Sequence, residues 1–274
     1  MKMFRSILRH AILLGFLLLS AYPLLWMALA SVRTEGDARR YPFSPPREWT
    51  AENLRVVAES GSFGQAYVNS VVVCVAGVFG AVALSSCAAF AFARLRFRGQ
   101  RALFLLFLLG MMVPVHVTLI PLNRLMGTGG LGLKGTLWAL IGPYIGFALP
   151  LSILILRGAF ARIPEELVDA ARIDGCSTWG VFTRVALPLV RSAIATVVIF
   201  NFLTMWNEFA FALTLLDPAR PTLPLAITQF SGEHGIRLTQ TCAALTVVVL
   251  PLLVVYCLAQ KHIIRGLTAG AVKG

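Results

Sequence analysis

The sequence predicts an all-α integral membrane protein with six membrane-spanning helices in a single domain, residues 1–274. Of its 274 residues 58% are hydrophobic and only 13% are charged, whereas soluble domains carry about 25% charged residues. Six apolar runs are also long enough to cross a hydrocarbon core of roughly 30 Å as helices. These predicted spans are residues 11–30, 66–93, 102–122, 136–156, 193–216 and 241–259.

The first run has the features of a membrane span and some features of a signal peptide. Lys2, Arg5 and Arg9 precede it, and Ala28-Leu29-Ala30 resembles a cleavage site. However, the run is longer than the 7–15 apolar residues of a signal core. We therefore predict a retained first helix, with cleavage as the alternative.

The remaining runs differ in their small residues and prolines. The second is dense in glycine, alanine and serine, so we expect it to pack inside the bundle, where small side chains let helix backbones approach closely. Pro114 and Pro121 interrupt the third run, and the fourth has the spacing Gly142-x-x-x-Gly146, which alone is weak evidence of packing. The proline-rich segment 31–65 predicts an external loop with little regular structure.

A charged interval, residues 157–192, separates the fourth and fifth runs and predicts a helix, a sharp turn and a second helix outside the membrane. Pro164 suits the first position of a helix. Glu165 and Glu166 then lie in the first turn, where carboxylates favour the positive end of the helix dipole. Gly175 predicts the turn, because glycine readily takes a left-handed conformation.

The first of these helices is expected to bind a protein. Leu167, Ala170 and Ala171 recur at helical spacing and form a narrow apolar face. The alternative is an amphipathic helix lying on the membrane, but such helices favour basic residues on the polar face. Anionic lipid would repel the carboxylates of this helix, including Asp169.

Several motifs of the second half of the chain occur together in one known family. They are Asp169-Ala170-Ala171, Asp174-Gly175, Phe182, Leu187-Pro188, Trp206-Asn207-Glu208-Phe209 and the end from Gln260 to Gly274. In this order they resemble the carbohydrate-uptake branch of bacterial ABC importer permeases, on the side of the smaller maltose-transporter permease. Asp169 replaces the usual glutamate and keeps its charge on a shorter stem, and Ser192 stands where a second proline is common.

The resemblance implies a type I importer fold with a cytoplasmic coupling helix that docks on an ATPase. It also implies a sister six-span permease in a heterodimer, two ATPase subunits, an extracytoplasmic sugar-binding protein, and a sugar, oligosaccharide, polyol or sugar phosphate as substrate. The implied docking residues are Glu165, Glu166, Leu167, Asp169, Ala170, Ala171, Asp174, Gly175, Phe182 and Pro188. In such a subunit the tail, here with Gly270, Lys273 and Gly274, reaches the interface between the ATPases.

The distribution of basic residues predicts the orientation. Of the 24 Lys and Arg, 15 lie on the side of the two termini and of residues 157–192, and nine lie on the other. Five of those nine are in the long first loop, and long loops weigh less in the positive-inside rule. We expect a multi-pass protein of the bacterial inner membrane with both termini and the docking loop in the cytoplasm.

Motifs for chemistry are missing from the sequence. No G-x-x-x-x-G-K-[ST] phosphate loop occurs, so we expect ATP and Mg to bind partner subunits and no cofactor or metal to bind this chain. H-E-x-x-H and G-x-S-x-G are absent too, which disfavours a membrane enzyme. The basic residues flank apolar runs and form no nucleic-acid-binding face. An ion-gradient-driven secondary transporter, the main alternative, normally needs paired ionisable residues near the midplane.

Glu208 is the one acidic residue inside a predicted span. A carboxylate there costs about 2.5–3.5 kcal/mol, so it should face a cavity or a partner. One interpretation places Glu208 with Trp206 and Asn207 along the substrate pathway. In the other, Glu208 caps a helix at the external interface and Trp206 anchors that interface. The sequence leaves both open.

Overall fold

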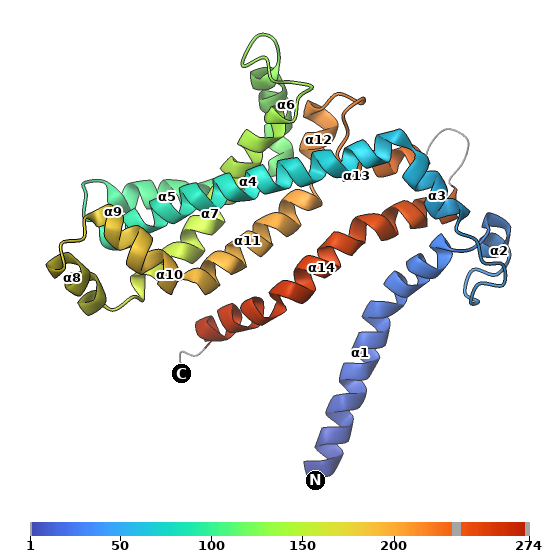
Figure 1. The fold of residues 1–274 in the computed structure, drawn as a ribbon, viewed down its shortest axis with the longest axis horizontal. Coiled ribbons are helices and arrows are strands. Elements are labelled where there is room, and N and C mark those ends of the chain that lie inside the picture. The colour runs from blue at the N-terminus through green and yellow to red at the C-terminus, as the bar shows by residue number, and fades with distance from the viewer. Residues whose placement is uncertain (1, 232–236, 272–274) are drawn as a thin grey trace. The chain divides into compact units, whose positions relative to one another are not determined.

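The computed structural model describes residues 2–231 and 237–271 and confirms the all-α fold class (Figure 1). Every regular element in these ranges is helical, and the β pairing there is limited to two isolated bridges. The elements are α1 (Lys2–Ser31), α2 (Glu35–Arg40), α3 (Glu52–Glu59), α4 (Gly61–Arg94), α5 (Gln100–Gly110), α6 (Val115–Met126), α7 (Trp138–Ala161), α8 (Glu165–Ile173), α9 (Thr178–Gly180), η1 (Val181–Ala186), α10 (Leu187–Leu189), α11 (Arg191–Trp206), α12 (Ala210–Leu215), α13 (Leu223–Ala226), η2 (Ile227–Ser231) and α14 (Leu238–Ala271).

Four of these helices, α1, α4, α7 and α14, are long and apolar enough to cross a membrane. Two bent pairs could each supply one more crossing, which gives up to six. One pair is α5 with α6, bent by 98°, and the other is the segment Thr178–Leu189 with α11, bent by 77°. The described chain therefore has between four and six candidate spans.

Two predicted spans are broken in the structure. The run 102–122 is interrupted between Gly110 and Val115, because Pro114 has no N–H to donate and disfavours a helical conformation for the residue before it. The run 193–216 is interrupted between Trp206 and Ala210. Glu208 thus lies in a break between two helices instead of within a continuous span.

The chain forms two compact units, and residues 1–64 and 226–251 make up the first. Its loop 31–65 was expected to have little regular structure, and that expectation is wrong. The loop contains α2 and α3 and is built around the buried side chain of Arg33. The Arg33 guanidinium donates to the Asp37 carboxylate at 3.0 Å and to the carbonyls of Asp37, Tyr41 and Ser44.

Within this first unit Glu35 caps the start of α14. Its carboxylate accepts hydrogen bonds from the backbone N–H groups of Leu238 and Thr239, at 3.3 and 3.0 Å, and from the Thr239 hydroxyl at 2.9 Å. Burial raises the pKa of Glu35, but the hydrogen bonds from Thr239 and Arg39 outweigh burial and hold this pKa below its ordinary value. A carboxylate at a helix start satisfies free N–H groups and the helix dipole.

Residues 65–225 and 252–274 make up the second unit. The small residues of α4 pack closely there, as predicted. A β-carbon on Gly80 would overlap the Ile145 side chain of α7, and one on Gly77 would press on Met205 of α11. Gly142 and Gly146, by contrast, have no neighbour within reach of an added β-carbon. In Figure 1, α8 lies at the end of this unit where α4 and α7 finish, and α6 and α12 lie together above the middle of α4, away from α8.

We predict that Glu35→Gln weakens the capped start of α14 by about 1 kcal/mol, because an ionised acceptor binds N–H groups more strongly than an amide does. The extra stabilisation by the ionised Glu35 should be complete above pH 4.5, the ordinary pKa of glutamate. It should be lost as the pH falls through the pKa of Glu35 in the folded protein, which is lower. Hydrogen exchange at Leu238 and Thr239 measures it. Glu59→Gln, at an exposed side chain, is the control, and equal exchange in both variants at pH 7 would contradict the prediction.

Candidate functional site

The predicted docking helix is α8, and a defined turn ends it. Gly175 has a φ of 83°, so the predicted left-handed conformation is confirmed. The Gly175 N–H donates to the Arg172 carbonyl at 3.0 Å, and the Cys176 N–H donates to the Ala171 carbonyl at 2.9 Å. This pair of bonds is a Schellman motif, which satisfies the last carbonyls of a helix and reverses the chain.

The inward face of α8 differs from the predicted apolar face. Val168 and Ala171 are the buried residues of this helix, while Leu167 is 45% exposed and Ala170 is also exposed. The expectation that Ala171 faces a partner is therefore not met. Ala171 and Val168 instead attach α8 to its own chain, and Leu167 and Ala170 remain on the accessible side.

Phe182, another predicted docking residue, is buried in an aromatic cluster. Its ring centroid lies 5.1 Å from that of Phe90 in α4 and 6.2 Å from that of Phe160 in α7. Phe90 and Phe160 meet edge to face at 5.6 Å. Phe182 belongs to η1, a π-helical turn, and joins the segment after α8 to α4 and α7.

Arg94 makes a second connection between these elements. Its guanidinium donates to the Phe160 carbonyl at 2.7 and 3.0 Å and to the Ile163 carbonyl. These carbonyls belong to the end of α7 and to the turn that precedes α8. In the sequence, Arg94 counts only among the basic residues that predict the orientation, although its place at the end of an apolar run also suits a helix cap.

Most of the predicted docking residues lie on the accessible surface of this end. Glu165, Glu166, Leu167, Asp169, Ala170, Asp174, Gly175 and Pro188 are exposed, whereas Ala171 and Phe182 are buried. Two exposed apolar side chains beside them were not among the predicted docking residues: Ile173, 87% exposed, and Trp179, 65% exposed. Their position in an otherwise charged interval was the available signal.

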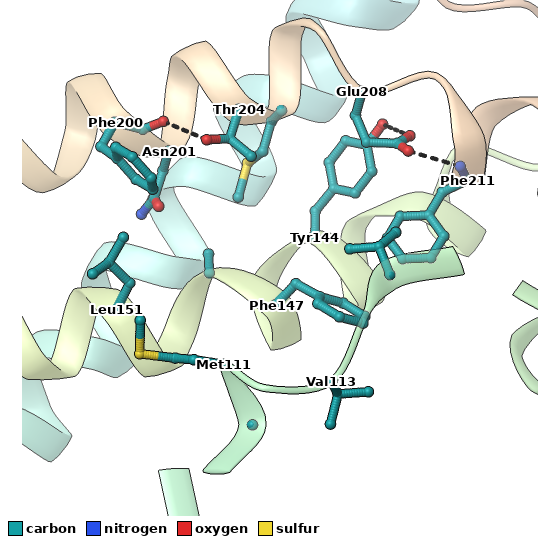
Figure 2. A pocket seen from close by; sticks show the side chains of 14 residues that line it. Met111, Val113, Tyr144, Phe147, Leu151, Phe200, Asn201, Thr204, Glu208 and Phe211 are labelled. Carbon is teal, nitrogen blue, oxygen red and sulfur yellow. Dashed lines mark hydrogen bonds between the residues drawn. The ribbon is translucent and has the colours of Figure 1, made fainter. Parts of the chain in front are cut away.

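A cavity of about 270 Å³ lies elsewhere in the second unit, between α7, α11, α12 and the break between α5 and α6. Figure 2 shows that aromatic and aliphatic side chains form most of its wall. Its residues are Gly110, Met111, Val113, Val115, Tyr144, Phe147, Ala148, Leu151, Phe200, Asn201, Thr204, Met205, Glu208 and Phe211.

Glu208 lines this cavity and also caps α12. Its carboxylate accepts a hydrogen bond from the Tyr144 hydroxyl at 2.9 Å and from the backbone N–H of Phe211 at 2.8 Å (Figure 2). It also accepts one from the backbone N–H of Ala212 at 3.3 Å. The structure thus gives Glu208 a helix-capping position at the wall of a cavity. The charge is held in place by three donors and borders an otherwise apolar space.

The two neighbours of Glu208 do not line the cavity. Trp206 is 2% exposed and packs edge to face against Tyr67 at 5.9 Å, so it is neither an interfacial anchor nor a wall of this space. Asn207 is exposed and donates to the Leu203 carbonyl at 2.8 Å. Of the predicted tail residues, Lys273 and Gly274 lie outside the described ranges, and Gly270 lies in the last turn of α14.

Within the described ranges, no group of three or more His, Cys, Asp or Glu side chains could hold a metal ion. What the geometry offers is an exposed helix, α8, whose flanking segments are attached to α4 and α7, and a cavity with one fixed carboxylate.

Comparison with known proteins places this chain in one family. Residues 81–269 match the family described as "Binding-protein-dependent transport system inner membrane component". A putative ABC transporter permease protein of Caldicellulosiruptor is 41% identical, over 94% of this chain and 93% of that protein. The trehalose/maltose transport system permease protein of Thermococcus litoralis is 34% identical, over 96% of this chain and 95% of that protein.

A similar fold is found in the crystal structure of a bacterial ABC transporter involved in alginate import. One of its chains matches with a TM-score of 0.82 at 22% identity, covering 95% of this chain and 96% of the other. That structure supports the predicted type I importer fold. The chain belongs to the inner membrane components of binding-protein-dependent transport systems and is a permease subunit of an ABC importer, not a secondary transporter or an enzyme.

Proposed function

We propose that this permease imports a sugar or oligosaccharide, or a related polyol or sugar phosphate, together with a sister six-span permease. The observation that supports this most directly is the 34% identity to the trehalose/maltose permease over nearly the whole of both chains. The cavity fits the proposal, because aromatic walls and a few fixed polar groups are typical of ligand sites. At about 270 Å³ it is just below the usual range of roughly 300–1,000 Å³, so the sister chain would complete the passage.

The proposed energy source is ATP, bound with Mg by two separate ATPase subunits. α8 would dock on one of them through its exposed face, with Leu167, Ala170 and Ile173 as apolar contacts. Closure of the ATPase pair would then displace α8, and the Phe182 cluster and Arg94 would transmit this displacement to α4 and α7. The orientation follows from this role: the docking end and both termini would lie in the cytoplasm, and a sugar-binding protein would deliver substrate from the other side.

Sugar-stimulated ATP hydrolysis by the assembled importer tests the proposal. The chain is purified with the products of neighbouring genes, reconstituted in vesicles, and assayed with its binding protein against a panel of sugars. We expect hydrolysis to rise with one class of sugar and with no amino acid. Stimulation by an amino acid instead would refute the proposed substrate class while leaving the family assignment intact.

The turn at Gly175 is predicted to set the direction of the docking helix. Gly175→Val should lower the docking-competent population about five- to thirtyfold, since a side chain in the left-handed region costs about 1–2 kcal/mol. Co-purification of the ATPase and transport should both fall, while insertion of the permease pair should not. Gly175→Asn is the matched control, because asparagine tolerates this conformation; an equal loss in both variants would point to a side-chain clash instead.

The charge of Glu208 is predicted to contribute to substrate passage. Glu208→Gln keeps an oxygen that can cap α12 but removes the charge from the cavity. Uptake at limiting sugar should fall about tenfold, because a hydrogen bond to a charged group contributes about 1.5 kcal/mol. Basal ATP hydrolysis should stay close to that of the unmodified protein, and thermal stability should fall only slightly, because the weaker amide cap of α12 costs about 1 kcal/mol.

Asp217→Asn provides the control for this substitution. Asp217 also accepts a backbone N–H, from Ala219 at 2.8 Å, and it lies outside the cavity. Unchanged uptake in Glu208→Gln would leave Glu208 with its capping role alone.

A further inference from the structure

Basic side chains without acidic partners gather at the end of α4. Arg94, Arg96, Arg98 and Arg101 follow one another closely, and no Asp or Glu occurs between Glu59 and Glu165. Arg94 already donates hydrogen bonds to the Phe160 carbonyl at the end of α7. For the other three, the structure gives no ion pair with any residue in the described part of the chain.

One of these arginines lines a pocket between α5 and α7. This pocket, of about 410 Å³, is lined by Phe92, Gln100, Arg101, Phe104, Leu105 and Arg157. It contains two positive charges, one amide and no acidic residue. Because no acidic side chain of the pocket neutralises these two charges, the pocket favours an anion.

Arg157 is held in position at this pocket. Its guanidinium carbon lies 4.2 Å from the centroid of the Phe104 ring, and its Nε–H points to the Phe92 carbonyl at 3.5 Å. Gln100 donates to the same carbonyl at 2.8 Å. No acceptor for the two Nη groups of Arg157 is found among the described residues, so these groups remain available to a ligand.

The apolar side of the pocket continues along the outside of α5. Leu105 is 49% exposed, and Leu109, one turn further on, is 58% exposed. A ligand that places an anionic group at the arginines and a hydrocarbon chain along these leucines would satisfy both halves. A free anion would leave the apolar half uncovered, and a carboxylate of the ATPase would not account for it either.

We propose that this pocket binds the headgroup phosphate of an anionic phospholipid, such as phosphatidylglycerol, between Arg101 and Arg157. Basic pockets between membrane helices on the cytoplasmic side are suited to such headgroups. The bound lipid would connect the start of α5 to α7, four residues before the end of the helix that leads to α8. The placement in the cytoplasmic leaflet rests on the proposed orientation, whereas lipid binding itself does not depend on the transported sugar.

Native mass spectrometry of the assembled importer, purified in detergent and titrated with phosphatidylglycerol or phosphatidylcholine, tests the site. Arg101→Gln should lower retained phosphatidylglycerol about fivefold, and adding Arg157→Gln should lower it about fivefold more, since each basic residue near an anionic surface contributes about 1 kcal/mol. Phosphatidylcholine retention should not change. Arg101 is exposed, so the single variant should fold even if Arg157→Gln disturbs α7.

Arg98→Gln is the matched control, because it removes the same charge from the same turn but outside the pocket. An equal loss of phosphatidylglycerol in this control would show diffuse attraction and overturn the proposed pocket. Unchanged retention of phosphatidylglycerol in Arg101→Gln would also overturn it. So would an Arg101→Gln importer that loses its ATPase subunit but retains phosphatidylglycerol. Glycerophosphoglycerol, the headgroup without its chains, should compete poorly, and competition at the concentration of the lipid would reduce the site to one for free anions.

Discussion

The last carbonyls of α7 and of the turn after it are the groups on which the attachment of α8 to this unit depends. A helix leaves its last carbonyls without partners, and such groups are costly wherever water is excluded. Arg94 supplies donors to the Phe160 and Ile163 carbonyls and thereby ties the end of α4 to the turn before α8. The Phe90, Phe160 and Phe182 rings exclude water around this connection. Motion of α8 would therefore reach two long helices without passing through a flexible loop.

The cavity depends on the same constraint elsewhere in the second unit. Broken helices are tolerated at membrane depth where the freed backbone groups find partners or line a cavity. At the break after Trp206, the Glu208 carboxylate takes the free N–H groups of Phe211 and Ala212 and is itself fixed by Tyr144. The residue that repairs the backbone is thus also the residue that gives the cavity its charge. At the end of α7 and at the start of α12, a charged side chain thus binds the backbone groups that a helix leaves without partners.

Local sequence signals predicted the turn at Gly175 and the small-residue packing of α4, because each depends on one residue's own conformational freedom or size. They failed for the loop 31–65, where composition suggested little structure. That loop is ordered by Arg33, whose partners lie up to 11 residues away, and by Glu35, whose partners lie more than 200 residues away. No local pattern contains information about partners so distant.

The sequence by itself determined the membrane class, the helical fold, the family and the helix and turn of the charged interval 157–192, since hydropathy, spacing and short motifs are local properties. Only the tertiary structure decided which side of α8 is accessible, that Ala171 and Phe182 face inward, that Trp206 is buried, and that Glu208 lies in a break beside a cavity. Helical periodicity places residues on a common face but does not say which neighbour covers that face. For α8 both Leu167 and Val168 are apolar, and only the packing of α4, α7 and η1 buries one and leaves the other exposed.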